Sequence, residues 1–120
     1  MVSSHRGYDF MITISKIRRV VADGFGVSQQ EIMSRSRRQP IALARQASVY
    51  YCRKVLGIKY ADLGFYFRRN HSNMLYAERS IEDRKIYDRE TKAILEGLES
   101  EFPWLKGEEV KEGINGYFKR

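Results

Sequence analysis

The chain has 120 residues, 42% of them hydrophobic and 31% charged, which is enough for one domain with a buried core. Its 22 lysines and arginines exceed its 15 aspartates and glutamates, for a formal net charge of +7 that favours an acidic partner. No apolar run approaches the roughly 18 residues of a membrane span, and one cysteine with two histidines gives neither an internal disulfide nor zinc-ligand spacing.

The first predicted helix lies near the N-terminus, where apolar residues recur at helical spacing: Ile14, Ile17 and Val21. Thr13 or Ser15 is its expected N-cap, and Gly24 or Gly26 its expected end.

A short second helix and a basic loop come next. Ser28 and Glu31 have the three-residue spacing of a capping box, which predicts a helix start. The stretch SRSRRQP, residues 34–40, has no apolar periodicity and ends in proline, so it predicts a loop.

A third helix is predicted from about Ala42 to Leu56, with Gly57 as its end. The face expected to point inward carries small and apolar residues: Ala44, Ala47, Tyr51, Cys52 and Val55. The face expected to point outward carries Arg45, Gln46, Val49 and Arg53.

Two further helices follow, separated by the short polar turn RRN, residues 68–70. The first, within IKYADLGFYF, is short and holds Leu63 and Phe67; the second starts near His71 and directs Met74, Ala77 and Ile81 inward. This order predicts a helix-turn-helix.

Asp88 is the expected N-cap of a sixth helix, RETKAILEGLESEF, which should stop at Pro103. No strand is predicted, so the expected fold is all-α with about six helices. We expect residues 1–87 to form the helix-turn-helix domain and residues 88–120 a C-terminal helical extension that packs on it or trails it.

Positive charge is concentrated in residues 34–69, which hold nine basic residues and one acidic residue, a net of +8. Because the whole chain carries +7, the remaining residues sum to −1. A charge run of this kind is often only a solvated surface, but here it surrounds a predicted helix-turn-helix.

The start of the fifth helix groups side chains that can hydrogen-bond to base edges: Asn70, His71, Ser72, Asn73 and, one turn on, Tyr76. Arg68 and Arg69 precede them, and these two positive charges favour DNA binding over capping alone. The simpler alternative is that Asn70 or Ser72 is only an N-cap. Arginines of the basic loop suit a narrow minor groove, and outward-facing residues of the third helix suit phosphates.

Several motifs together resemble the C-terminal DNA-binding domain of DnaA, the bacterial chromosomal replication initiator. They are ITISKI…VVADGFGVS, EIMSRSRRQPIALARQ and CRKVLGIKYADLGFYF…NHSNMLYAERSIE, within residues 12–82. The resemblance implies a Trp-repressor-like helix-turn-helix that reads a short box of double-stranded DNA. Carried over by position, Arg37 would enter the minor groove with Arg35 and Arg38 beside it, while Arg45, Gln46 and Arg53 would hold the backbone.

The chain departs from the family pattern at the DNA-reading end. The turn FRRNH is one residue shorter than the family's F-G-G-R-D-H and lacks both glycines, and Asn70, Ser72 and Asn73 replace D, T and T. We therefore expect the preferred DNA sequence to differ from the usual box of the family.

The 120 residues contain no G-x-x-x-x-G-K-[ST] motif, so we expect no nucleotide binding, no ATPase part and no enzyme activity. We also expect no cofactor, no metal, no membrane association and a cytoplasmic location. The favoured hypothesis is a freestanding, sequence-specific binder of double-stranded DNA in replication initiation or its regulation. The alternative is a protein-interaction module that uses residues 88–120, including the aromatic residues Phe102, Trp104, Tyr117 and Phe118.

Overall fold

The computed structural model describes the backbone of residues 6–102 and the side chains of residues 14–102. These residues form six α-helices and no strand: α1 (Arg6–Phe25), α2 (Gln29–Met33), α3 (Ile41–Leu56), α4 (Tyr60–Phe67), α5 (His71–Tyr87) and α6 (Arg89–Glu99). The prediction of an all-α fold with a helix-turn-helix is confirmed, with α4 and α5 as its two helices. Pro103, Trp104, Tyr117 and Phe118 lie outside the described residues.

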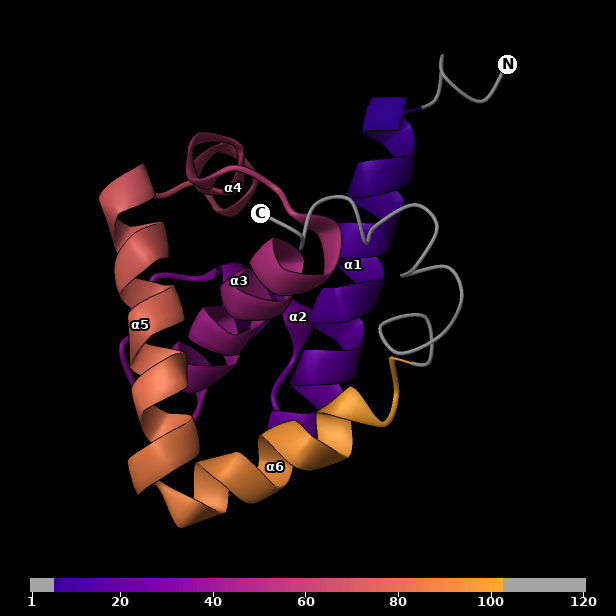
Figure 1. The fold of residues 1–120 in the computed structure, drawn as a ribbon. Coiled ribbons are helices and arrows are strands. Elements are labelled where there is room, and N and C mark those ends of the chain that lie inside the picture. The colour runs from indigo at the N-terminus through magenta and orange to yellow at the C-terminus, as the bar shows by residue number, and fades with distance from the viewer. Residues whose placement is uncertain (1–5, 103–120) are drawn as a thin grey trace.

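Helix α3 lies at the centre of the bundle and packs against both α1 and α5, while α6 crosses one end and contacts α5 and α1 (Figure 1). The core between them consists of apolar side chains that are almost completely buried, among them Ile17, Tyr51, Phe67, Ile81 and Leu95. Burial of apolar surface of this kind is the main stabilising term in folding. The bundle therefore fixes where α4 and α5 lie relative to the centre.

Two helix starts are capped, and one helix ends, as the sequence predicts. Ser28 Oγ accepts from the Glu31 amide at 3.0 Å and Glu31 Oε1 accepts from the Ser28 amide at 2.9 Å, which confirms the capping box of α2. Asp88 Oδ1 accepts from the Thr91 amide at 3.2 Å at the start of α6. At the other end of α3, Gly57 adopts the left-handed conformation (φ 68°) of a helix-ending glycine.

Two predicted boundaries are wrong. Helix α1 begins at Arg6, so Thr13 and Ser15 lie inside it and do not cap it. The apolar spacing of the later residues continues back through Phe10, and a helix interior tolerates single Thr or Ser residues when that periodicity persists. Helix α6 ends at Glu99 and not at Pro103, and Phe102 folds back into the core with 1% of its surface exposed.

The turn between α4 and α5 is tight because the chain passes close to Gly64. The Arg69 amide donates to the Gly64 carbonyl at 2.9 Å, and a Cβ at Gly64 would lie 2.5 Å from the Arg69 carbonyl oxygen. Only glycine permits that approach. Arg68 turns the chain in the left-handed conformation (φ 59°), which places Asn70 at the N-cap of α5.

Candidate nucleic-acid interface

A hollow of about 820 Å³ lies where the 34–40 loop, α3, the turn and the start of α5 meet. Its lining is Arg35, Arg37, Ala42, Arg45, Gln46, Val49, Arg68, Arg69, Asn70, Asn73, Met74, Tyr76 and Ala77. We call it the basic hollow, because five of these residues are arginines and none is acidic. The fold thus brings together nine of the thirteen site residues expected from the sequence.

Three arginines at the rim of the basic hollow have guanidinium groups without a partner among residues 14–102. Arg35, Arg37 and Arg68 are exposed, and within residues 14–102 their side chains make no hydrogen bond or ion pair. Arg38 is exposed in the same loop but does not line the hollow. Uncommitted guanidinium groups around a concave surface can pair with several phosphate oxygens at once.

Serine side chains shape the 34–40 loop locally. Ser34 Oγ accepts from the Ser36 amide and Ser36 Oγ accepts from the Arg38 amide, each at 3.2 Å. Such side-chain to backbone bonds replace a helical ladder with consecutive turns. They leave Arg35 and Arg37 on a short, exposed arc of the chain.

Arg45 does not point outward, and this corrects the expectation that it holds phosphate from the outer face of the third helix. Only 9% of its surface is exposed, its Nε donates to the Ile32 carbonyl at 2.7 Å, and its Nη2 donates to the Ser34 carbonyl at 2.7 Å. Burial, assisted by the nearby charge of Arg69, lowers its pKa below the ordinary arginine value. Val49, predicted on the same outward face, is 1% exposed, because α5 covers that side of α3.

Gln46 and Arg53 lie in different surroundings. Gln46 is half-buried in the hollow, where its Oε1 accepts from Ser80 Oγ at 2.9 Å and its amide nitrogen has no partner among residues 14–102. Arg53 does not line the hollow. Its guanidinium lies 4.3 Å from the centre of the Tyr60 ring and donates to the Ile58 carbonyl at 3.1 Å. The fold therefore separates Arg53 from the other expected residues.

At the start of α5 the polar side chains divide into a cap and exposed groups. Asn70 Oδ1 accepts from the Asn73 amide at 3.3 Å and from Ser72 Oγ at 2.8 Å, so the capping interpretation holds for Asn70. The side chains of His71 and Asn73 are exposed and make no hydrogen bond within the described part of the chain, and Tyr76 is 64% exposed. These three groups are available to a ligand.

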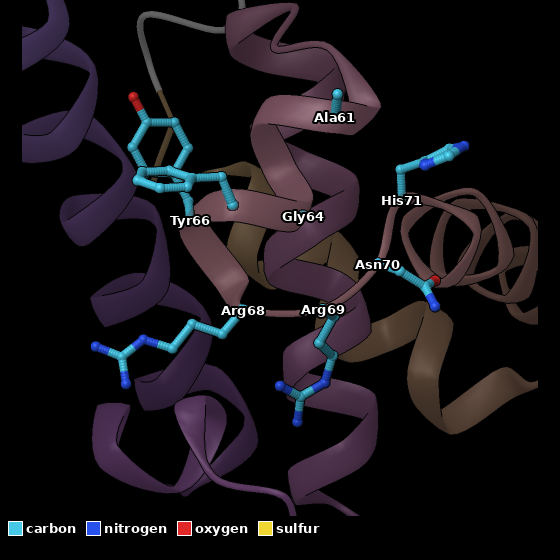
Figure 2. A pocket seen from close by; sticks show the side chains of 8 residues that line it. Ala61, Gly64, Tyr66, Arg68, Arg69, Asn70 and His71 are labelled. Atoms are coloured by element: carbon cyan, nitrogen blue, oxygen red, sulfur yellow. The ribbon is translucent and has the colours of Figure 1, made fainter.

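A second hollow adjoins the turn on the α4 side, and Arg68, Arg69 and Asn70 line both hollows. Figure 2 shows Arg68 and Arg69 leaving the turn on the side away from Ala61, while Asn70 and His71 lie where α5 begins. His71 lines only this second hollow. The histidine and Asn73 therefore face different parts of the surface around one helix end.

The sequence did not predict two features of the site: the small residues that line the basic hollow and the carbonyl acceptor in the 34–40 loop. Ala42 and Ala77 line the basic hollow, and the Ser34 carbonyl accepts from two arginines. Alanine is common in any helix and a carbonyl belongs to every residue, so neither leaves a signal in the sequence. Within the described residues, no helix is long and apolar enough to cross a membrane, and no three potential metal ligands come together.

Comparison with known proteins gives a consistent result. The model of the bacterial DnaA helix-turn-helix family matches residues 14–81. The chain is 40% identical over 73 residues to chromosomal replication initiator protein DnaA 1 of Chlamydia pneumoniae, covering 61% of this chain and 16% of that protein. It is 34% identical over 83 residues to the DnaA of Onion yellows phytoplasma, covering 69% of this chain and 16% of the relative. It therefore spans about a sixth of the length of these relatives.

Proposed function

Since the chain belongs to the bacterial DnaA helix-turn-helix family, we propose that it binds double-stranded DNA and distinguishes between DNA sequences. The observation that carries this proposal is the basic hollow, in which a helix start with exposed polar groups lies beside a loop with uncommitted arginines. Phosphate contacts from arginines give affinity, and polar groups at a helix start give base recognition.

In the proposed complex the start of α5 enters the major groove. Asn73 would pair with a base edge, since an asparagine amide can both donate to and accept from adenine. Tyr76 would lie beside it in the same hollow, and His71 would contact the DNA from the other side of the helix start. Arg37 would enter the adjacent minor groove, with Arg35 and Arg38 beside it. Arg68 and the free amide nitrogen of Gln46 would hold phosphates.

The biological role proposed for this binding is in replication initiation or its regulation, where the protein would occupy sites of the kind that initiators bind. No ATPase step is assigned to these residues, and the location implied by such a target is the cytoplasm. We keep residues 1–87 as the DNA-reading part and residues 88–120 as an extension whose helix α6 packs on α1 and α5.

A protein partner for the C-terminal part is the second candidate, and one observation favours it. Ile86 and Tyr87, at the junction of α5 and α6, are 71% and 83% exposed. The apolar residues Leu95 and Leu98 of α6 are buried in the core and are not available to a partner. A partner would therefore contact the junction or residues beyond 102.

The salt dependence of DNA binding tests the main proposal. Contacts to roughly five to seven phosphates should give a slope of about −5 to −6 in a plot of log affinity against log salt. Replacing Arg35 and Arg68 on the rim by glutamine should make that slope shallower by about 2. The matched control replaces the exposed α6 residues Arg89 and Lys92 by glutamine and should leave the slope unchanged. A slope near zero, or no binding to any duplex at low salt, would overturn the proposal.

A further inference from the structure

The carbonyl oxygen of Ser34 accepts hydrogen bonds from two arginines that belong to different elements. Arg45 of α3 donates to it from Nη2 at 2.7 Å, and Arg69 of the turn donates from Nη2 at 2.6 Å. Ser34 is the first residue of the basic 34–40 loop. The start of the loop is thus tied both to the central helix and to the turn of the helix-turn-helix.

The second bond of Arg69 makes the connection rigid. Its Nη1 donates to the Phe67 carbonyl at 3.1 Å, so one planar guanidinium spans the end of α4 and the start of the loop. Arginine can hold two acceptors in a fixed geometry because its donors form a flat fork. A lysine ammonium keeps the charge but has no such fork.

Arg45 donates to the same carbonyl from the central helix α3. Its Nε bond to the Ile32 carbonyl holds the last turn of α2, and the side chain is buried. Among the described residues, the other side-chain hydrogen bonds of the loop are local, within Glu31–Arg38. The two arginines therefore supply the side-chain hydrogen bonds that connect this loop to the rest of the fold.

We propose that Arg69 is a positioning residue that fixes the basic loop relative to α5 through the Ser34 carbonyl, with Arg45 as the fixed anchor. We call the bonds of Arg69 and Arg45 to the Ser34 carbonyl the clamp. This inference rests on the proposed function: if the loop reads the minor groove and α5 the major groove, the clamp sets the number of base pairs between the two contacted regions of the DNA. Specificity for the combined site then depends on a residue that touches no base.

The variant that isolates this role is Arg69→Lys, because it keeps the charge and removes the fork. The matched control is Arg68→Lys at the neighbouring exposed arginine, which makes no side-chain hydrogen bond in residues 14–102. In the free protein, the backbone amides of Ser36 and Arg38 should exchange with solvent about tenfold faster in Arg69→Lys than in Arg68→Lys. Equal exchange in both variants would overturn the clamp without any reference to DNA.

The DNA measurement uses the preferred duplex selected from a random pool, and the same duplex with one base pair inserted between the two contact regions. The wild-type chain should bind the inserted duplex at least about tenfold more weakly than the preferred one. Arg69→Lys should lose most of that discrimination while keeping its salt slope and its affinity for random duplex.

A different result would identify Arg69 as an ordinary phosphate contact. In that case Arg69→Gln would make the salt slope shallower by about 1, and discrimination between the two duplexes would remain. Circular dichroism spectra of all variants check that the fold is kept. Failure of the wild-type chain to bind any duplex would overturn the proposed function, whereas the exchange measurement would still decide whether the clamp exists.

Discussion

At the scale of single residues, Arg68 combines a strained backbone conformation with an exposed positive charge. It adopts φ 59° and ψ 44°, and among the described residues it is the one non-glycine with positive φ. The left-handed conformation costs a side chain with a Cβ about 1 kcal/mol. The strained turn places on the rim of the basic hollow a guanidinium that makes no hydrogen bond or ion pair within residues 14–102.

Arg68→Gly should relieve the strain and weaken DNA binding together. We expect the free energy of unfolding, measured with urea, to rise by about 0.5–1 kcal/mol, and the salt slope of DNA binding to become shallower by about 1. The control is Arg38→Gly in the same basic region, where φ is not positive and added chain entropy should lower stability slightly. A stability loss in Arg68→Gly as large as that of Arg38→Gly would contradict the strain argument.

Residue identity predicted much of the candidate site, but side-chain direction did not follow from it. The apolar pattern of residues 42–56 predicts a helix with one buried side, which places Arg45 and Val49 on an outward face. In the fold α3 is covered by α1, α2 and α5, so both residues are buried. Likewise the Ser34 carbonyl gains its role from residues 11 and 35 positions away, which no local pattern encodes.

At the scale of elements, the predicted helices were right where local chemistry decides them. The capping box of α2, the Asp88 cap of α6 and Gly57 after α3 are all short-range signals, and each is confirmed. The wrong boundaries are the start of α1 and the end of α6, and at the end of α6 packing decides the last helical residue. Phe102 leaves the helix because it is buried against Tyr51, with ring centres 5.3 Å apart.

Glu78 links three elements and makes their packing sensitive to acid. It lies on α5, accepts from the Tyr60 hydroxyl of α4 and pairs with Lys54 Nζ of α3 at 3.1 Å. Burial alone would raise the pKa of its carboxyl group, but the hydrogen bonds from Tyr60 and Lys54 and the charge of Lys54 together lower the pKa below the ordinary 4.5. A lowered pKa means that this stabilisation is present above pH 4.5 and is lost as the pH falls through the folded-state pKa.

We therefore expect the urea-measured stability of the wild-type chain to fall as the pH drops below 4.5, and Glu78→Gln to reduce this dependence. At pH 7 the same variant should lose about 1–2 kcal/mol, because Lys54 loses a charged partner. The matched control is Glu82→Gln, which removes a more exposed carboxylate 3.4 Å from the same lysine and should cost under about 0.5 kcal/mol. Parallel pH profiles for wild type and Glu78→Gln would contradict this account.

At the scale of the whole molecule, the residues of the basic hollow and the helix that supports them lie in different parts of one bundle. Residues 34–69 and the start of α5 supply the basic hollow, while α6 closes the opposite end of α5 (Figure 1). Tyr51 joins the two parts, since its hydroxyl donates to Glu99 Oε2 at 2.8 Å from the middle of α3. The position of α5 against the hollow therefore depends on a helix that contributes nothing to its lining.

This dependence predicts how truncated chains behave. Leu95, Leu98 and Phe102 are 0%, 3% and 1% exposed, and each buried apolar side chain of this size contributes about 1.5–3 kcal/mol. A chain ending at residue 87 loses all three, a sum comparable to the about 5–15 kcal/mol that holds a whole domain folded. We expect urea unfolding of that chain to lose its cooperativity and its DNA binding to disappear, although every residue of the basic hollow is present. A chain ending at residue 102 keeps the three side chains and should still unfold cooperatively and bind DNA. If the chain ending at 87 also unfolds cooperatively and binds DNA, α6 is not part of the folding unit that positions α5.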